Sequence, residues 1–133
     1  MKQRREKRRE MAEIEINNYQ IHKQLFSQMK PLDDEKLGEK LASVGSWFSA
    51  HMKQRYFMLM CKEENYYTVL NIKDMNYSKA VKELRDLLTW QGDILDIRYV
   101  HGEDAYECWV KDEDEESKMF YLFVYDWGVI EIE

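Results

Sequence analysis

The chain has 133 residues, a hydrophobic fraction of 44% and an aromatic fraction of 14%, which suit one domain with a packed core and exclude wholesale intrinsic disorder. Its net charge of −6 is unevenly distributed, because residues 1–30 carry eight Lys or Arg against four Glu, whereas residues 101–133 carry two against eleven Asp or Glu. No apolar run approaches the roughly 20 residues of a membrane span or follows the charged start as in a secretory signal, so we expect a cytoplasmic protein.

Residues 3–30 are predicted to form a helix. Their apolar residues fall at spacings compatible with one helical face: Met11, Ile14, Ile21, Leu25 and Met29. Residues 1–10 lack such a stripe, so we expect a basic arm or frayed helix start there, ahead of a single domain over residues 11–133. Pro31 ends the helix because it lacks an amide donor and disfavours helix in the preceding residue.

A second helix is predicted to start near Asp33, whose side chain can cap the free amide groups. Its apolar stripe has spacings of four, three and four residues: Leu37, Leu41, Val44 and Phe48. Gly45 weakens this helix and marks either an early end or a close packing point. RYFMLMC and YYTVLNI, with KEEN between them, then predict a β-hairpin with a polar turn.

A third helix is predicted in DMNYSKAVKELRDLLTWQG, where Asn76 or Ser78 can cap the start and Gly92 the end. Its expected stripe is Tyr77, Val81, Leu84 and Leu88.

The rest of the chain is strand-like. ILDIRYV alternates around Leu95, Ile97 and Tyr99. AYECWVK alternates around Tyr106, Cys108 and Val110. MFYLFVY is nearly all apolar and predicts a central strand buried on both faces, and VIEIE predicts a short edge strand. The predicted fold class is α+β, with N-terminal helices followed by an antiparallel sheet of about six strands and one inserted helix packed on a face.

The residue types of common active sites form no recognisable pattern. The histidines match no triad or metal spacing, and P-loop, nucleophile-elbow and CxxC motifs are absent from the sequence. We therefore assign no catalytic residue, metal site or cofactor, and interpret Cys61 and Cys108 as small buried residues. A metal-dependent nuclease is the third reading of the chain, on four residues near predicted strand ends: Asp93, Asp96, Glu107 and Lys111.

The most acidic run is Asp112, Glu113, Asp114, Glu115 and Glu116. It is either a solvated hairpin tip or a surface that competes with nucleic acid for a basic groove, because a field of Lys and Arg does not distinguish carboxylates from phosphates. Further carboxylates would extend this surface if the turns gather at one end: Glu103, Asp104, Asp126, Glu131 and Glu133.

Two tryptophans are candidate partner contacts. Trp109 is out of phase with Cys108 and Val110, so it faces the other side of its strand, where it either packs under a helix or anchors a partner. Trp127, in the DWG turn, is a candidate anchor for the same reason.

The opening run holds six basic residues: Lys2, Arg4, Arg5, Lys7, Arg8 and Arg9. It can neutralise several phosphates in a salt-sensitive way, but it lacks the interleaved aromatics of sequence-specific readout. It is interpreted as a solvated helix end, as a contact with nucleic acid or nucleoprotein, or as a contact with the acidic end of another copy.

Several segments follow one another over residues 1–111: MKQRREKRRE running into a helix, GSWFSAHMK before the first strand, VLNIKDMNYSKAVKELRDLL, and the pair ILDIRYV and YECWVK. In this order of elements the chain resembles small phage-encoded Cas9 inhibitors, which are anti-CRISPR proteins with a basic N-terminal arm ahead of an α/β body. MFYLFVYDWGVIEIE has no counterpart there. The resemblance implies a protein that binds Cas9 with its guide RNA and blocks DNA cleavage, and that needs the Lys and Arg residues of the arm.

We therefore expect a non-enzymatic interaction protein of phage or mobile-element type, located in the host cytoplasm, that inhibits a host nucleic-acid-processing complex through its polarised charge. The alternative is a structural or assembly protein that forms a homo-oligomer through its N-terminal helices.

Overall fold

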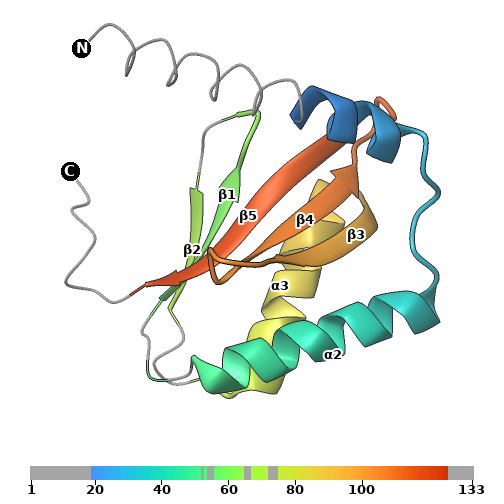
Figure 1. The fold of residues 1–133 in the computed structure, drawn as a ribbon. Coiled ribbons are helices and arrows are strands. Elements are labelled where there is room, and N and C mark those ends of the chain that lie inside the picture. Colours follow the sequence, from blue (N-terminus) through green and yellow to red (C-terminus); the bar gives the residue numbers. More distant parts are fainter. Residues whose placement is uncertain (1–18, 52, 54–55, 65–66, 72–74, 126–133) are drawn as a thin grey trace, which may run out of the picture.

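The structure is a computed structural model that describes residues 19–51, 53, 56–64, 67–71 and 75–125 (Figure 1). Over these residues it contains three helices and a five-stranded antiparallel sheet, which confirms the predicted α+β class. Among these helices none is long and apolar enough to cross a membrane.

The five strands lie in the order β2-β1-β5-β4-β3, and each neighbouring pair is antiparallel. Their bounds are β1 Tyr56–Cys61, β2 Tyr67–Asn71, β3 Asp93–Val100, β4 Ala105–Lys111 and β5 Ser117–Tyr125. Strand β5 is central, as its apolar sequence predicts, but it is buried on both faces only near its start, at Met119 and Phe120. Farther along, Tyr121 and Phe123 are only half-buried. The predicted edge strand, residues 129–133, lies outside the described residues.

Helix α2, Asp34–Ala50, begins where the sequence predicts, because Asp33 Oδ1 accepts a hydrogen bond from the backbone N of Lys36 at 2.8 Å. Its predicted apolar stripe is buried: Leu37, Leu41, Val44 and Phe48. Gly45 does not end the helix. It is buried where α2 faces the next helix, and a Cβ added there would meet Val81 at 3.5 Å, an ordinary van der Waals distance.

Helix α3, Tyr77–Gln91, is capped by the first of its two candidates, Asn76, whose side chain accepts a hydrogen bond from the backbone N of Lys79 at 2.9 Å. Gly92 ends the helix as predicted, with a φ of 154°. The fully buried residues of α3 are Ala80, Leu84 and Leu88. The predicted stripe is wrong at Tyr77, which is exposed because it lies at the surface of a groove between α3 and α2.

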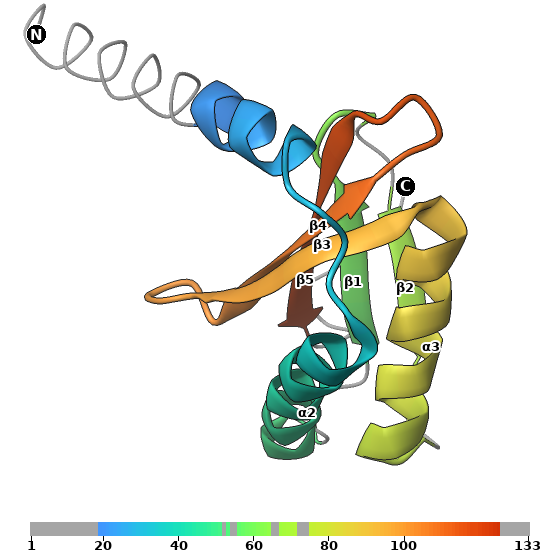
Figure 2. The same ribbon diagram turned by 90° about the vertical axis from the view of Figure 1, so that its right-hand side faces the viewer.

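Helices α2 and α3 lie on the same face of the sheet, which we call the helical-layer face (Figure 2). Alternate side chains of the strands pack against these two helices in one large core, and they include Phe57, Leu59, Phe120 and Leu122. Cys61 and Cys108 are buried free thiols in this core, as predicted, and burial raises the pKa of both.

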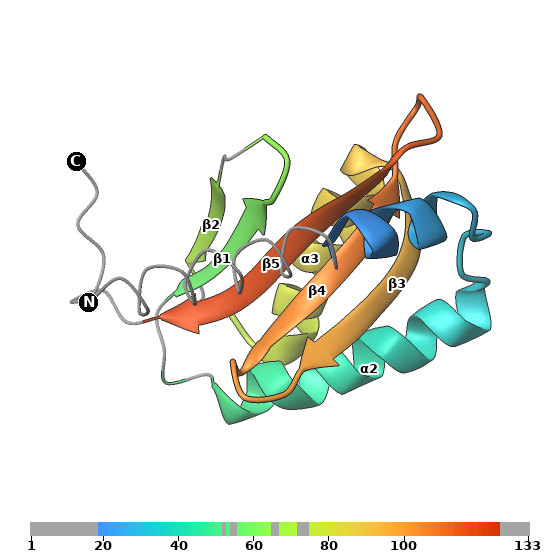
Figure 3. The same cartoon turned by 45° about the horizontal axis from the view of Figure 1, so that its top comes forward.

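Residues 19–27 form the third helix, which we call the helical segment, and they cover part of the opposite face (Figure 3). A second, smaller core lies between this segment and the sheet: Phe26, Leu95, Trp109 and Met119. The position of Leu95 corrects the predicted alternation of β3. A β-bulge between Ile94 and Asp96 adds a residue, so Leu95 and Ile97 belong to different cores on opposite faces.

The predicted apolar stripe also faces outward, at Ile21 and Leu25 on the helical segment and at Met29 just past its end. Ile21, Leu25 and Met29 have relative exposures of 61%, 58% and 36%, whereas Phe26 is 3% exposed. The large aromatic ring of Phe26 has a flat partner in Trp109, and that contact fixes which side of the segment faces the sheet. Met11 and Ile14, which the sequence adds to the stripe, lie outside the described residues.

Candidate interaction surface at the β4–β5 loop

Asp112 shapes the β4–β5 loop from inside. Its Oδ1 atom accepts hydrogen bonds from the backbone N of Asp114 at 2.9 Å and of Glu116 at 3.0 Å. The backbone N of Asp112 also donates to the carbonyl of Glu116 at 2.9 Å, which closes the loop. Of the five predicted carboxylates, Asp112 is therefore the one used to build the loop.

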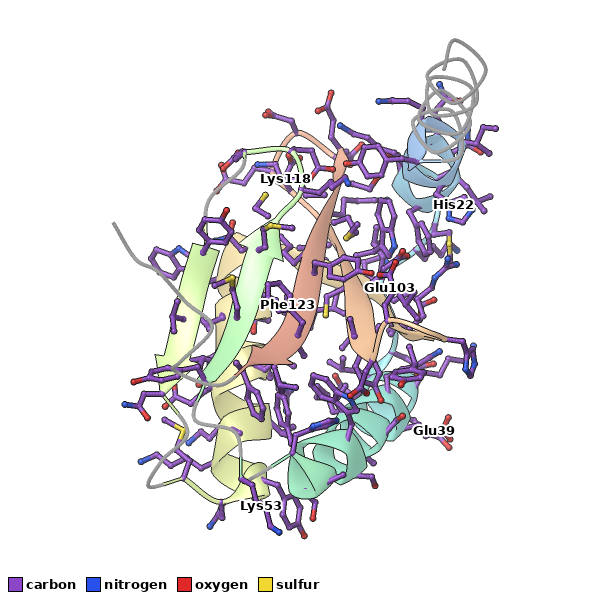
Figure 4. All side chains as sticks on the ribbon, turned by 60° about the vertical axis from the view of Figure 1, so that its left-hand side comes forward. His22, Glu39, Lys53, Glu103, Lys118 and Phe123 are labelled. Carbon is purple, nitrogen blue, oxygen red and sulfur yellow. The ribbon has the colours of Figure 1, made fainter. Side chains whose placement is uncertain are left out.

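The other four carboxylates form what we call the acidic tip, Glu113, Asp114, Glu115 and Glu116, and all four residues are exposed. No ion pair in the described part of the chain includes any of them. The nearby cation Lys118 binds elsewhere, at 2.8 Å from Glu64 and 3.7 Å from Asp112 (Figure 4). The hydrogen bond to Glu64 raises the pKa of Lys118. The acidic tip therefore keeps its negative charge available to a partner.

The helical segment is fastened beside this loop. Ser117 is fully buried, and its Oγ donates to the carbonyl of Lys23 at 2.6 Å while its backbone N donates to Ser27 Oγ at 3.1 Å. Glu116 shares a small surface hollow with Lys23, Ser27 and Gln28. The acidic tip thus lies at the C-terminal end of the helical segment.

The predicted extension of the acidic surface is wrong for Glu103 and Asp104. They lie in the β3–β4 turn, at the opposite end of β4 from the acidic tip, because antiparallel neighbours place successive turns at opposite ends of a strand. Asp104 accepts hydrogen bonds from Trp47 Nε1 at 2.7 Å and from Tyr99 OH at 3.0 Å, and it pairs with His51 Nε2 at 2.9 Å. The bond from Trp47 is the main cause of a lowered pKa for Asp104.

Trp109 packs under a helix, which is the first of the two alternatives that the sequence leaves open for it. It is 1% exposed, and its ring stacks on Phe26 with 4.5 Å between centroids. Its Nε1 donates to Glu107 at 3.3 Å, and the same Glu107 oxygen lies 3.3 Å from Arg98 Nε. Trp109 is therefore a core residue and not an exposed partner anchor.

The other predicted contacts lie outside the described residues: Lys2, Arg4, Arg5, Lys7, Arg8, Arg9, Asp126, Trp127, Glu131 and Glu133.

A hollow of about 500 Å³ on the sheet face beside the helical segment was not predicted. Its floor includes Met60, Met119 and Tyr121, and His22 and Glu103 lie at its sides (Figure 4). The sequence carries a signal for it in β1 and β5. The residues that alternate with the core positions of these strands face the other side of the sheet, and they are mostly Met or aromatic instead of charged.

Two of the three carboxylates of the nuclease alternative pair with cations. Asp96 lies 3.2 Å from Lys40, and Glu107 binds Arg98. Lys111 Nζ donates to the carbonyl of Met29 at 2.8 Å. Within the described ranges, no group of three or more His, Cys, Asp or Glu side chains could hold a metal ion.

Comparisons with known proteins give no match, whether with family models, with curated proteins or with solved structures. The acidic tip and its neighbours are therefore the basis for a functional proposal.

Proposed function

We propose that the protein is an interaction protein of phage or mobile-element type that inhibits a host nucleic-acid-processing complex, and that its specific form is inhibition of CRISPR–Cas. The acidic tip is the contact with the basic groove of that complex. One observation supports this best: Asp112 fixes the loop internally and leaves four neighbouring carboxylates exposed without an ion pair in the described chain.

A preorganised acidic loop suits this role for two reasons. The Lys and Arg field of a nucleic-acid groove attracts carboxylates as it attracts phosphates, and this attraction weakens as salt screens it. A loop already ordered by its own hydrogen bonds loses less conformational entropy on binding than a flexible one.

The resemblance to small Cas9 inhibitors supports the specific form of the proposal. It adds the basic residues of the arm, at positions 2, 4, 5, 7, 8 and 9, as a second contact with the nucleoprotein. The acidic tip and the arm would then bind regions of opposite charge on the same complex.

The test uses Cas9 loaded with guide RNA and measures both binding of the protein and inhibition of target DNA cleavage, at low and high salt. The tip variant is Glu113→Gln/Asp114→Asn/Glu116→Gln, which leaves Asp112 intact. The matched control is Glu39→Gln/Asp86→Asn/Glu103→Gln, which removes the same charge from exposed residues away from the loop. We expect the tip variant to bind about tenfold more weakly, a loss of about 1.4 kcal/mol, and the control to bind like the wild type.

Two results would contradict the proposal. Equal affinity of the tip variant and the control would remove the acidic tip as a contact. Undiminished DNA cleavage at saturating protein would reject the Cas9 form.

A further inference from the structure

The hollow of about 500 Å³ beside the helical segment combines an apolar floor with an acidic side. Met60, Met119 and Tyr121 form the floor, and two glutamates line the same space: Glu107 from β4 and Glu103 from the turn before it (Figure 4). Concave sites of this size, apolar with a few polar groups, are typical of ligand-binding sites.

Strand pairing places an aromatic ring beside a carboxylate in this hollow. Tyr121 of β5 lies directly opposite Glu107 of β4 and, on its other side, directly opposite Met60 of β1. Residues opposite one another in antiparallel strands share a face of the sheet, and neighbouring strands are about 4.8 Å apart. The ring of Tyr121 and the carboxylate of Glu107 therefore border the same space.

Both carboxylates keep acceptor oxygens available. Glu107 Oε1 lies 3.3 Å from Trp109 Nε1 and 3.3 Å from Arg98 Nε, whereas Oε2 has no bond to any described residue. Glu103 is exposed, and its side chain has no hydrogen bond or ion pair in the described chain. Two carboxylates on one side of the hollow attract a cationic ligand and repel an anionic one.

The basic residues that line the hollow do not neutralise these two carboxylates. Lys62 Nζ lies over the ring of Tyr19, 5.8 Å from its centroid. His22 Nδ1 lies 3.4 Å from a guanidinium nitrogen of Arg98, and it is the acceptor in that contact because arginine can only donate. The lining residues thus offer two carboxylates against the single ammonium group of Lys62.

The chain already holds one guanidinium group between a carboxylate and an aromatic ring. Arg98 pairs with Glu107 through Nε, and its guanidinium carbon lies 5.7 Å from the ring centroid of Phe26. The hollow offers the same two kinds of group to a ligand, in the ring of Tyr121 and the available oxygens of the two glutamates. Its floor adds an apolar surface for a methylene chain.

We propose that the hollow binds an arginine side chain of a partner protein. The methylene stem packs on Met60, and the guanidinium stacks on Tyr121 and donates to Glu103 and Glu107. Arginine suits the hollow better than lysine, because its group is planar, weakly hydrated and able to donate to two oxygens at once. A nucleic acid suits it less, because its phosphates would approach the two carboxylates.

This site goes beyond the proposed function. Tyr19 and His22, from the N-terminal part of the helical segment, line the hollow, whereas Ser27 and Glu116 lie together at the acidic tip. A ligand can therefore fill the hollow without contacting the tip, and its binding can be measured without Cas9.

The first experiment titrates the full chain with capped Gly-Arg-Gly peptide and follows the backbone amides by two-dimensional NMR. We expect saturable shifts at Met60, Glu107 and Tyr121, with a dissociation constant of about 1 mM for this single side chain. The matched peptides carry lysine, or citrulline, whose neutral group has the shape of guanidinium. Lysine should bind about threefold more weakly and citrulline more than about tenfold.

The second experiment changes the hollow. Tyr121→Leu keeps an apolar floor without the ring and should raise the dissociation constant of the arginine peptide about fivefold, whereas Tyr121→Phe should restore binding. Glu103→Gln should raise it about threefold, because an exposed charge pair is lost. Glu113→Gln is the matched control, since it removes the same charge at the acidic tip, and it should change the constant less than about twofold. Each variant should keep the wild-type circular dichroism spectrum.

Four results would overturn the proposal. They are equal binding of the arginine and citrulline peptides, shifts confined to the acidic tip, an equal loss in Glu113→Gln and Glu103→Gln, and tighter binding of a short oligothymidylate than of the arginine peptide at the hollow. The last result would make the ring of Tyr121 a stacking surface for nucleic acid bases instead. None of these results depends on Cas9, so a failure of the proposed function would leave them unchanged.

Discussion

The two faces of the sheet are covered to different extents. On the helical-layer face, α2 and α3 seal a large core in which Phe48 and Phe57 stack with 3.9 Å between ring centroids. On the opposite face, the helical segment covers a small core around Trp109, and Tyr121 and Phe123 are only half-buried. The first face therefore supplies most of the stability, whereas the second supplies surfaces: the hollow, the exposed side chains of Ile21 and Leu25, and the neighbouring acidic tip.

The largest expected effect on stability comes from truncating a side chain in the core of the helical-layer face. Phe48→Ala removes a fully buried ring and should lower the free energy of unfolding by about 3–5 kcal/mol, because it loses the burial of the ring and leaves a cavity. Urea unfolding followed by circular dichroism measures this loss. Trp90→Ala, on the outer surface of the same layer, should change stability by less than about 0.5 kcal/mol. Similar losses in the two variants would contradict the assignment of the main core.

Phe26→Ala tests the opposite face and should have a smaller global effect. Loss of the ring that stacks on Trp109 should let the helical segment open locally while the rest of the sheet stays folded. Hydrogen exchange should therefore become fast in residues 19–27 and stay slow in α2, α3 and β5, and Trp109 fluorescence should shift to the red. A global loss as large as that of Phe48→Ala would show that the two faces unfold as one unit.

The sequence predicts the helical-layer face well and the opposite face poorly, for a physical reason. The stripes of α2 and α3, the caps Asp33 and Asn76 and the central position of β5 follow from local patterns, and the structure confirms them with Tyr77 as the exception. The orientation of the helical segment depends on a tertiary contact, Phe26 on Trp109, and residues 21, 25 and 29 have an equally regular spacing. Periodicity identifies an apolar row but not what covers it.

The candidate site shows the same limit. The run of five carboxylates is visible in the sequence, but the internal role of Asp112 depends on the turn it makes with Asp114 and Glu116. The separation of Glu103 from the acidic tip follows only once β4 is known to pair with both β3 and β5. Charge composition thus predicts the acidity of this part of the chain, and sheet topology decides which carboxylates lie together.

The smallest expected effect concerns Asp104, at the end of the molecule away from the acidic tip. Hydrogen bonds from Trp47 and Tyr99 and the charge of His51 lower the pKa of Asp104 in the folded chain, against a smaller opposing effect of desolvation. A carboxylate with a lower pKa in the folded state than in the unfolded state stabilises the fold above its unfolded pKa of about 4, and this contribution disappears as the pH falls through the folded value. Because the side chain is half exposed, solvent screening keeps the contribution small.

Asp104→Asn isolates this contribution, since Asn tolerates the φ of 49° at this position and retains one hydrogen-bond acceptor. We expect a slightly lower Tm at pH 7 and a Tm that falls less than that of the wild type as the pH drops below 4. Glu103→Gln, in the same turn, should follow the wild-type curve because Glu103 has no hydrogen bond or ion pair through its side chain in the described chain. If Asp104→Asn and the wild type lose stability in parallel over this range, the carboxylate is not what holds the β3–β4 turn to α2, and the stacking of Trp47 on Phe57 and its edge contact with Tyr106 must do so instead.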